Sequence, residues 1–301
     1  MASELYPHRG FMLDTGRKFF PVKTILVLLT ILQQNNFNVF HWHIYDAQSF
    51  PLYWPADGGL TNVSIRLSHT SEYYTPGDIQ TVIEHARGLG IQVYPETEMP
   101  GHCDIWGLWN KDLVVGTPSL ENPNAQLDIR QNKQETYDNV RSLVSTVDTY
   151  FGSPLHHFGG DEVAYIWETE DDNALFNSFL NWLKTLAPNK SLILWDDPLT
   201  DEGKDVTISK DWIIQTWHNG VTQQVLNKGH PVIVSESETF YIGNADRDKI
   251  SSFVFPDNPN VLGFELVWFT SEGDDPNDIH QNWIMEPIRA ASEIRRNSNN
   301  P

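Results

Sequence analysis

Short apolar runs alternate with longer amphipathic segments along most of the chain. In the longer segments, apolar residues recur every three or four positions, which predicts helices with one buried face. These segments are residues 22–32, 76–89, 134–150, 174–186 and 280–294. The short apolar runs predict strands. They are residues 11–13, 37–44, 91–94, 156–158, 191–195, 212–215, 231–234 and 261–265.

The order of these elements predicts the fold. Repeated strand-then-helix units indicate a parallel sheet, and eight strands in 301 residues favour a closed (β/α)8 TIM barrel, an α/β fold. A doubly wound open sheet is the alternative, although no Gly-x-Gly-x-x-Gly follows the first strand. Because no Ser/Gly run, Pro-rich stretch or charge block divides the chain, we expect one catalytic domain over residues 1–301. We expect no separate accessory domain before the barrel.

Composition excludes several classes of partner. The 20 basic and 40 acidic side chains give a net charge of −20. Nucleic-acid binding needs a basic surface, so we expect no nucleic-acid partner. No apolar run reaches the roughly 18 residues of a membrane span, so we expect no membrane partner either. The pattern does not indicate an oligomeric state.

The cellular compartment is indicated only weakly. Asn-x-Ser tripeptides at Asn62 and Asn189 fit a secreted or extracellular protein. The start of the chain lacks the basic-then-apolar pattern of a signal peptide, so a cytoplasmic location stays open. Cys103 is the only cysteine, which excludes an intramolecular disulfide, and we interpret it as a small packed residue.

Reactive side chains collect where the predicted strands end, which is where TIM barrels carry their active sites. Carboxylates and aromatic rings suit carbohydrates, because sugars present hydroxyls to the former and apolar C–H faces to the latter. Arg9 is an exception, since it lies at the start of the first run. The side chains at strand ends include Asp46, Glu96, Glu98, His102, Asp161, Glu162, Trp195, Asp196, Asp197, Trp217, His218, Glu236, Glu238, Tyr241 and Trp268.

Asp161 and Glu162 are the pair that could perform glycoside hydrolysis, which needs a proton donor and a second supporting group. Adjacent residues on a regular strand point to opposite faces. Both reach one pocket only if the backbone bends, and Gly159-Gly160 permits a bend. A general acid needs a pKa above its ordinary value of about 4.3, and we expect Asp161 and partial burial to raise that of Glu162.

A metal site is a competing interpretation of the histidines. His41 and His43 share one face of a predicted strand, and His156 and His157 are adjacent. No complete ligand set with a known spacing emerges from them. We therefore predict no metal and no cofactor.

Four segments together resemble glycoside hydrolase family 20, the β-N-acetylhexosaminidases. They lie in order at the ends of successive predicted strands, and the resemblance spans nearly the whole chain. It implies a compact single-barrel member of that family. The segments are residues 9–14 (RGFMLD), 41–51 (HWHIYDAQSFP), 95–102 (PETEMPGH) and 157–162 (HFGGDE).

The resemblance implies a substrate-assisted mechanism, in which the 2-acetamido oxygen of the sugar attacks the anomeric carbon and forms an oxazolinium ion. Glu162 would be the general acid and then the general base. Asp161 would orient the acetamide N–H, and Tyr241 would donate its hydroxyl to the acetamide oxygen. Asp46 and His102 resemble the pair that sits behind the acid and tunes it.

The resemblance also implies a set of substrate-binding residues. Trp195, Trp217 and Trp268 would wall the pocket, with Trp268 under the sugar ring, and Arg9 would hold ring hydroxyls. Two departures concern the far end of the sugar. Gly243 stands where the family often has an acid or amide, which makes Asn244 a candidate replacement. After Trp268 the next acid is Glu272, further along than the family pattern.

These observations favour an enzyme that releases terminal β-linked N-acetylhexosamine (GlcNAc or GalNAc) from an oligosaccharide or glycoconjugate. One alternative is a related member with altered specificity, such as a lacto-N-biosidase or an enzyme for 6-sulfo-GlcNAc. The other alternative is a non-catalytic barrel that only binds sugars. It would keep the aromatic wall and lose the acid.

Overall fold

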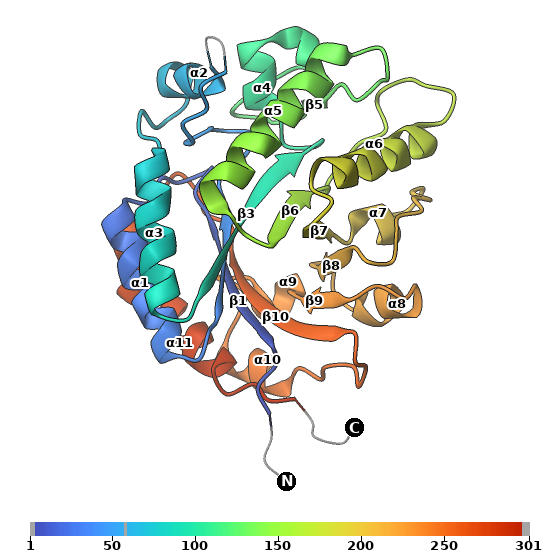
Figure 1. Cartoon of the computed structure of the whole chain (residues 1–301). Helices are drawn as coiled ribbons and strands as arrows, with labels where there is room; N and C mark the ends of the chain where they lie inside the picture. The colour runs from blue at the N-terminus through green and yellow to red at the C-terminus, as the bar shows by residue number, and fades with distance from the viewer. Residues whose placement is uncertain (1–3, 57–58, 297–301) are drawn as a thin grey trace.

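Eight parallel strands form a closed barrel in the computed structural model, which describes residues 4–56 and 59–296 (Figure 1). The predicted TIM barrel is confirmed, and the open-sheet alternative is wrong. The order around the barrel is β1-β10-β9-β8-β7-β6-β3-β2. The strands are β1 (His8–Asp14), β2 (Val39–His43), β3 (Gln92–Met99), β6 (Leu155–Gly159), β7 (Ser191–Trp195), β8 (Ile213–Thr216), β9 (Val232–Val234) and β10 (Val261–Trp268).

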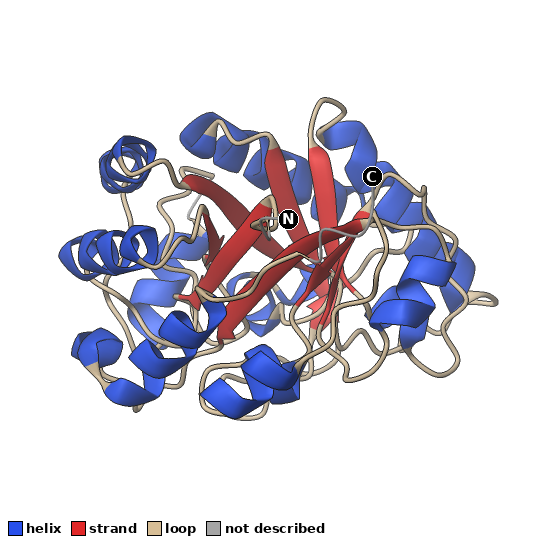
Figure 2. Cartoon of the chain, turned by 90° about the horizontal axis from the view of Figure 1, so that it is seen from below, coloured by secondary structure: helices blue, strands red, loops and turns tan. Residues whose placement is uncertain are grey.

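Helices surround the strands, as Figure 2 shows in a view along the barrel. The five helices predicted from apolar spacing are confirmed, with ends that shift by a few residues. They are α1 (Val22–Gln34), α3 (Pro76–Gly88), α5 (Gln134–Phe151), α6 (Asp172–Leu186) and α11 (Asn282–Ala291). Their apolar faces pack against the outer faces of the strands and form the main core.

Short elements in the loops were not predicted, because they are too short for apolar spacing to mark them. The short helices are α2 (Leu60–Leu67), α4 (Asp104–Trp109), α7 (Asp197–Thr200), α8 (Thr222–Asn227), α9 (Ser237–Phe240) and α10 (Arg247–Ser252). Two 3-10 turns, η1 (Lys111–Leu113) and η2 (Pro276–His280), add to them. The loop after β3 also contains an antiparallel pair, β4 (Val114–Val115) and β5 (Gln126–Leu127).

The barrel interior is layered. An apolar layer near the amino-terminal half of the strands contains Val39, Tyr94, Ile193, Ile213 and Ile233. A second apolar layer, of Met12, Trp195 and Val267, lies under Trp217, Tyr241 and Phe269. Buried His, Glu and Gln side chains also project inward from the strands. The barrel interior is therefore a packed core and not an open channel.

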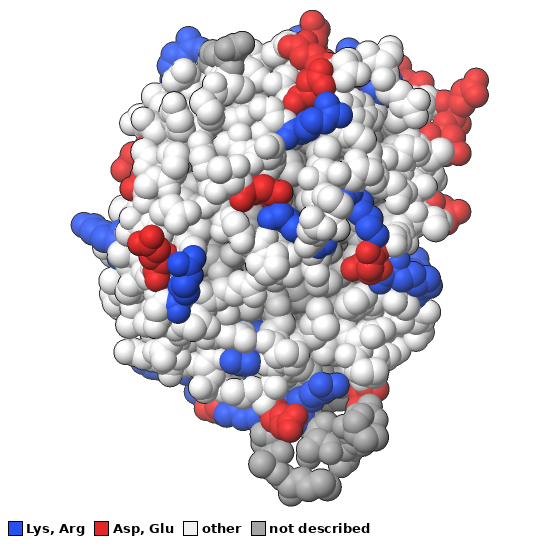
Figure 3. All heavy atoms as spheres, viewed as in Figure 1, with Lys and Arg blue, Asp and Glu red and all other residues white. Residues whose placement is uncertain are grey.

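Figure 3 shows basic and acidic side chains interspersed over the face drawn, several of them side by side. Among the residues that the structure describes, no helix is both long enough and apolar enough to cross a membrane.

Candidate active site

The backbone bends where β6 meets the mouth of the barrel. Gly159 and Gly160 have φ values of 70° and 85°, and Glu162 has a φ of 50°. This left-handed turn places Asp161 and Glu162 on the lining of one hollow. The predicted bend is confirmed. A regular strand would have sent the two carboxylates to opposite faces.

Substitution of Gly159 would test how strictly the bend depends on glycine. A Cβ added there would lie 1.9 Å from Oε1 of Glu98, in addition to the cost of a positive φ. We expect Gly159→Ala to destabilise the fold by more than the roughly 1–2 kcal/mol of left-handed strain alone. Gly152→Ala is the matched control, since Gly152 has a φ of 55° and nothing within 4 Å of the added Cβ. Equal urea midpoints for the two variants would contradict this account.

Asp161 is only 9% exposed, and its two carboxylate oxygens differ. Oδ2 lies 3.5 Å from Nε2 of His102. Oδ1 is buried and has no hydrogen-bond partner among the described residues. A buried carboxylate oxygen without a donor is costly, so this atom is suited to accept a hydrogen bond from a ligand.

Glu162 is far more accessible than Asp161, with 61% of its side chain exposed. Its Oε2 lies 3.1 Å from Nε2 of His102, and its backbone N–H donates to Asp197 at 2.9 Å. The hydrogen bond from His102 lowers the pKa of Glu162 and outweighs the effect of burial. The rise in pKa expected for Glu162 is therefore wrong, because the cationic His102 beside this carboxyl stabilises its charged form more than burial destabilises it.

His102 connects Glu162 to Asp46. Its Nδ1 lies 3.2 Å from Oδ1 of Asp46, whose Oδ2 contacts His43 at 2.7 Å and Arg17 at 2.9 Å. Burial opposes the charged form of His102, but Asp46 and Asp161 raise its pKa well above the usual value. The predicted pair of Asp46 and His102 therefore lies behind the Glu162 carboxyl.

The hollow that contains Asp161 and Glu162, which we call the acid-pair pocket, has a volume of about 360 Å³. Its wall combines a carboxylate pair, two cationic groups and three aromatic rings. Burial raises the pKa of Tyr241 well above its usual value, which keeps its hydroxyl protonated as a donor. The pocket is lined by Arg17, His102, Asp161, Glu162, Trp217, Tyr241, Phe269 and Thr270.

Arg9 does not reach this pocket. It lies near the amino-terminal end of β1, where its guanidinium donates to the backbone oxygens of Asn36 and Tyr6. Arg17, which sequence analysis missed, lies at the other end of β1 and lines the pocket. Its guanidinium contacts Asp14 at 3.2 Å and Asp46 at 2.9 Å. The sequence signal that could have identified Arg17 was its position three residues after the end of β1.

Two of the three predicted tryptophans do not line the pocket. Trp268 is 1% exposed and packs outward, with ring centroids 5.2 Å from Phe20 and 5.5 Å from Trp283. Trp195 is fully buried beneath the pocket, and its Nε1 donates to Glu96 at 2.8 Å. Trp217 lines the pocket as predicted.

Phe269 takes the place at the pocket that was predicted for Trp268. Side chains alternate along a strand. Glu265 points inward, because it accepts hydrogen bonds from His8 and His41 inside the barrel. Positions 267 and 269 therefore face inward, and Trp268 faces the helices. This alternation was the signal that sequence analysis overlooked.

Asn244 and Glu272 also lie outside the pocket lining. The side chain of Asn244 donates to the backbone oxygen of Ser237 at 3.2 Å, and its residue is exposed. Glu272 is exposed, and its backbone oxygen accepts from Lys18 at 2.7 Å. Neither the Glu272 carboxylate nor the Asn244 amide therefore reaches the pocket in this structure. Neither replaces the acid or amide that the family often carries after the seventh and eighth strands of the barrel.

A row of alternating imidazoles and carboxylates runs through the barrel to the acid pair. Glu96 was expected to follow the third strand, but it lies within β3 and is completely buried. Consecutive members approach within 2.7 to 3.2 Å of one another. The row consists of His8, Glu265, His41, Glu96, His43, Asp46, His102 and Glu162.

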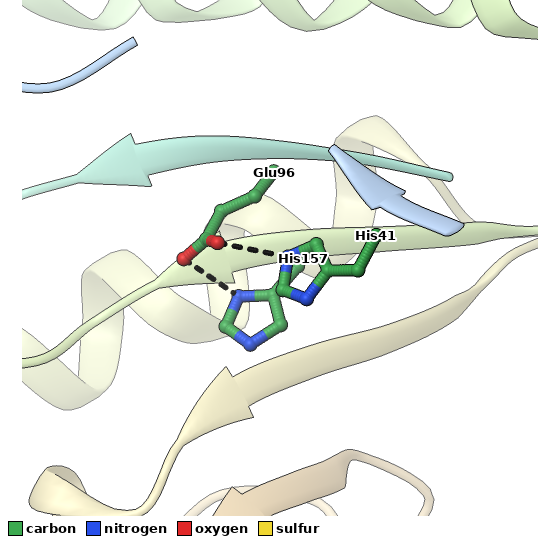
Figure 4. Close-up of side chains that lie close together, drawn as sticks. All are labelled: His41, Glu96 and His157. Carbon is green, nitrogen blue, oxygen red and sulfur yellow. Dashed lines mark ion pairs between the residues drawn. The ribbon is translucent and has the colours of Figure 1, made fainter. Parts of the chain in front are cut away.

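Figure 4 shows part of this row, where the Glu96 carboxylate contacts both His41 and His157, whose rings lie beside one another. Its ligand-type atoms and those of both imidazoles lie within 4.8 Å of one another, as in a metal site. However, Nδ1 of His157 accepts the N–H of Gly159, and burial lowers the pKa of His157 to about 3. Nε2 of His41 lies 2.8 Å from Oε2 of Glu96. These contacts account for the cluster as a buried charge pair beside a neutral imidazole.

His43 makes stability depend on pH. Burial opposes its charge, but Glu96 and Asp46 raise its pKa to about 10. The pKa of His43 in the unfolded chain is about 6.5. The stability that its charged form contributes is therefore complete below about pH 6.5 and is lost as the pH rises towards 10. We expect the urea midpoint to fall between pH 7 and pH 10. A midpoint that stays constant over this range would refute the charged state of His43.

Comparisons with known proteins agree with this geometry. Residues 6–261 match the family model described as glycosyl hydrolase family 20, catalytic domain. The beta subunit of beta-hexosaminidase from Felis catus is 35% identical over 256 residues, covering 77% of this chain and 47% of the relative. The Homo sapiens beta subunit is 34% identical over 261 residues, covering 77% and 45%. The chain spans about half the length of these relatives.

Solved structures share the fold. The β-N-acetylhexosaminidase of Bacteroides fragilis superposes with a TM-score of 0.84 and 20% identity, covering 98% of this chain and 67% of that one. A D313A variant of Streptomyces plicatus β-hexosaminidase gives 0.74 and 19%, covering 95% and 64%. The family match over residues 6–261, with a relative that is 35% identical over 77% of the chain, shows that the chain belongs to glycosyl hydrolase family 20.

Proposed function

We propose that this protein is a β-N-acetylhexosaminidase that uses the acetamide of its substrate as the nucleophile. The observation that carries the proposal is the free, buried Oδ1 of Asp161 beside the accessible carboxyl of Glu162. One carboxylate faces the pocket as a hydrogen-bond acceptor, and the other is exposed enough to exchange protons. This division fits a substrate-assisted reaction better than two equivalent carboxylates.

In the first step, the acetamide oxygen bonds to the anomeric carbon as the glycosidic C–O bond breaks. The proton of Glu162 passes to the departing oxygen. The result is an oxazolinium ion and a free leaving group. In the second step, Glu162 takes a proton from water, and the water oxygen bonds to the anomeric carbon. The bond between that carbon and the acetamide oxygen breaks, which restores the acetamide. The anomeric configuration is retained, and Glu162 regains its proton.

Asp161 and Tyr241 would hold the acetamide during these steps. Oδ1 of Asp161 accepts its N–H, and the negative carboxylate balances the positive charge of the oxazolinium ion. The Tyr241 hydroxyl, which stays protonated, donates to the acetamide oxygen. Phe269 and Trp217 supply apolar walls for the sugar, and Arg17 binds its hydroxyls.

The names of similar proteins support this assignment. The relatives from Felis catus and Homo sapiens are beta-hexosaminidase subunits, and the Streptomyces plicatus structure contains the product GlcNAc. We accordingly propose a 2-acetamido sugar at the end of an oligosaccharide or glycoconjugate as the substrate.

A panel of 4-nitrophenyl glycosides tests the proposal and separates its variants. It contains GlcNAc, GalNAc, 6-sulfo-GlcNAc and lacto-N-biose. The pocket lining lacks Asn244 and Glu272, so the group at C4 and C6 is the least constrained part of the substrate. Release from GlcNAc or GalNAc supports the simple exo-enzyme. Release only from a modified sugar or the disaccharide would reassign the specificity, and binding without any release would indicate a non-catalytic barrel.

Asp161→Asn should reduce turnover by roughly 10²–10³-fold, the effect of removing one charge-stabilising group at a reacting centre. The Asn amide can turn its own N–H towards the acetamide N–H, which leaves the acetamide without an acceptor. The neutral amide also cannot balance the positive charge of the oxazolinium ion. Single-turnover kinetics with 4-nitrophenyl-GlcNAc measures the effect directly. Asp211→Asn on the surface is the control, with 63% of the Asp211 side chain exposed. Turnover equal to that of the wild type would exclude the assigned role.

A further inference from the structure

We propose that Asp197 is a positioning residue of the active site, which ties the backbone of Glu162 to the indole ring of Trp217. This inference rests on the proposed function. Asp197 begins α7, directly after β7 and Asp196, and is 1% exposed. It does not line the acid-pair pocket, so it acts on a substrate only through the two residues that it holds.

Each oxygen of the Asp197 carboxylate accepts a hydrogen bond from a different wall of the acid-pair pocket. Oδ1 accepts the backbone N–H of Glu162 at 2.9 Å, and Oδ2 accepts the Nε1–H of the Trp217 indole at 2.6 Å. Glu162 follows β6, and Trp217 follows β8. One buried side chain after β7 therefore fixes the general acid and an aromatic wall relative to one another.

Glu162 depends on such a contact because its backbone is in an unfavourable conformation. Its φ of 50° lies in the left-handed region, which a residue with a Cβ adopts only where the surrounding structure holds it. The turn also packs against the start of α7, since a Cβ added at Gly160 would lie 3.8 Å from Cγ of Pro198. The hydrogen bond to Asp197 and this packing together stabilise the conformation in which the Glu162 carboxyl reaches His102.

Trp217 is held at both its main chain and its ring. Asp196 accepts the backbone N–H groups of Trp217 at 2.6 Å and of His218 at 3.3 Å, and it contacts Nδ1 of His218 at 2.7 Å. Asp196 thus fixes the main chain after β8, while Asp197 fixes the indole. A sugar that packs on this ring is therefore placed in a defined position relative to Glu162.

Only a side chain with two acceptors can hold both N–H groups. A carboxylate has two acceptor oxygens, whereas the amide of Asn has one acceptor and one donor. In Asp197→Asn, the amide N–H therefore faces either the Glu162 N–H or the Trp217 N–H. A buried donor without an acceptor is costly, so one of the two residues is expected to move.

The experiment measures kcat and KM for Asp197→Asn and Asp197→Ala, each in the wild-type background and combined with Trp217→Phe. The substrate is the 4-nitrophenyl glycoside of the panel that the wild-type protein cleaves fastest. In the wild-type background, we expect each variant to lower kcat by roughly 10–100-fold, the effect of a misplacement of about 1 Å at a reacting centre. A residue that only supports folding would change the folded fraction and leave kcat per folded molecule unchanged.

The Trp217→Phe background separates the two oxygens of Asp197. Phe keeps an aromatic ring but has no N–H, so the amide oxygen of Asp197→Asn can accept from Glu162 while its N–H opposes no donor. The loss of kcat from Asp197→Asn should therefore shrink to less than about 3-fold in this background. Asp197→Ala also removes the acceptor of the Glu162 N–H, so its loss should remain. Equal losses from Asp197→Asn in the two backgrounds would overturn the link to Trp217.

Asp128→Asn is the matched control, because Asp128 is also 1% exposed and lies outside the pocket lining. Its kcat per folded molecule should equal that of the wild type. A wild-type kcat in Asp197→Asn and Asp197→Ala would overturn the positioning role, while the proposed function would stand. If Asp197→Asn fails to fold by circular dichroism, Asp197→Ala decides. A wild-type protein that cleaves no glycoside of the panel overturns the proposed function, and the role of Asp197 with it.

Discussion

Glu162→Gln should lower turnover by roughly 10²–10⁴-fold, the share of a positioned general acid–base group. Gln has nearly the same shape but cannot give its proton to the departing oxygen. The exposed Glu170 provides a matched control, since Glu170→Gln changes the same atoms outside the pocket lining. Release of 4-nitrophenol from 4-nitrophenyl-GlcNAc measures both variants. A rate close to that of the wild type would remove Glu162 from the mechanism.

The pH dependence of the same reaction provides a second readout. The hydrogen bond from His102 lowers the pKa of Glu162, so the acid form of this carboxyl becomes scarcer as the pH rises. We expect kcat/KM to decrease above the pKa of Glu162 and to be highest at acidic pH. The residual rate of Glu162→Gln should lack this decrease, because the titrating group is gone. A decrease that persists unchanged in the variant would point to another acid.

Glu96→Gln should destabilise the fold by about 3–5 kcal/mol, the usual cost of removing one partner from a buried charge pair. Oε2 of Glu96 lies 2.8 Å from His41 and 2.7 Å from His43, and all three side chains are completely buried. Neutral Gln would leave both imidazoles without this compensating charge. Chemical denaturation at pH 6 measures the loss as a lower midpoint.

A surface pair serves as the control for this prediction. Asp211 contacts Lys184 at 2.5 Å, but the two side chains are 63% and 37% exposed. Asp211→Asn should therefore cost only about 0–1 kcal/mol. The loss in Glu96→Gln should also shrink at alkaline pH, where the imidazoles lose their protons. Equal losses in the buried and surface variants would show that the buried row is not charged as described.

The sequence alone determined the architecture, the acid pair and its turn. Apolar spacing marks the long helices and the strands because burial of one face repeats over many residues. Gly159-Gly160 marks the bend because few other residues adopt a positive φ. The short loop helices, such as α4, have too few residues to show a period, so the sequence did not mark them.

The direction of each side chain depended more on the tertiary structure. Trp268 and Phe269 are adjacent, and only the inward position of Glu265 in the closed barrel decides that Phe269 reaches the pocket. Arg9 lies at the start of β1 and Arg17 follows its end, and only the end where Arg17 lies contributes to the pocket. A motif therefore indicated which strand contributes to the site and did not indicate which neighbouring residue does so.

The protonation states were decided by the tertiary structure as well. From the sequence, Asp161 was expected to raise the pKa of Glu162, because it is the adjacent acid. The folded chain brings His102 within 3.1 Å of the Glu162 carboxyl, and this contact lowers the pKa. The sequence determined the residue types and their order along the barrel. Closure of the barrel determined which charges meet, because it joins residues far apart in the chain at hydrogen-bond distance.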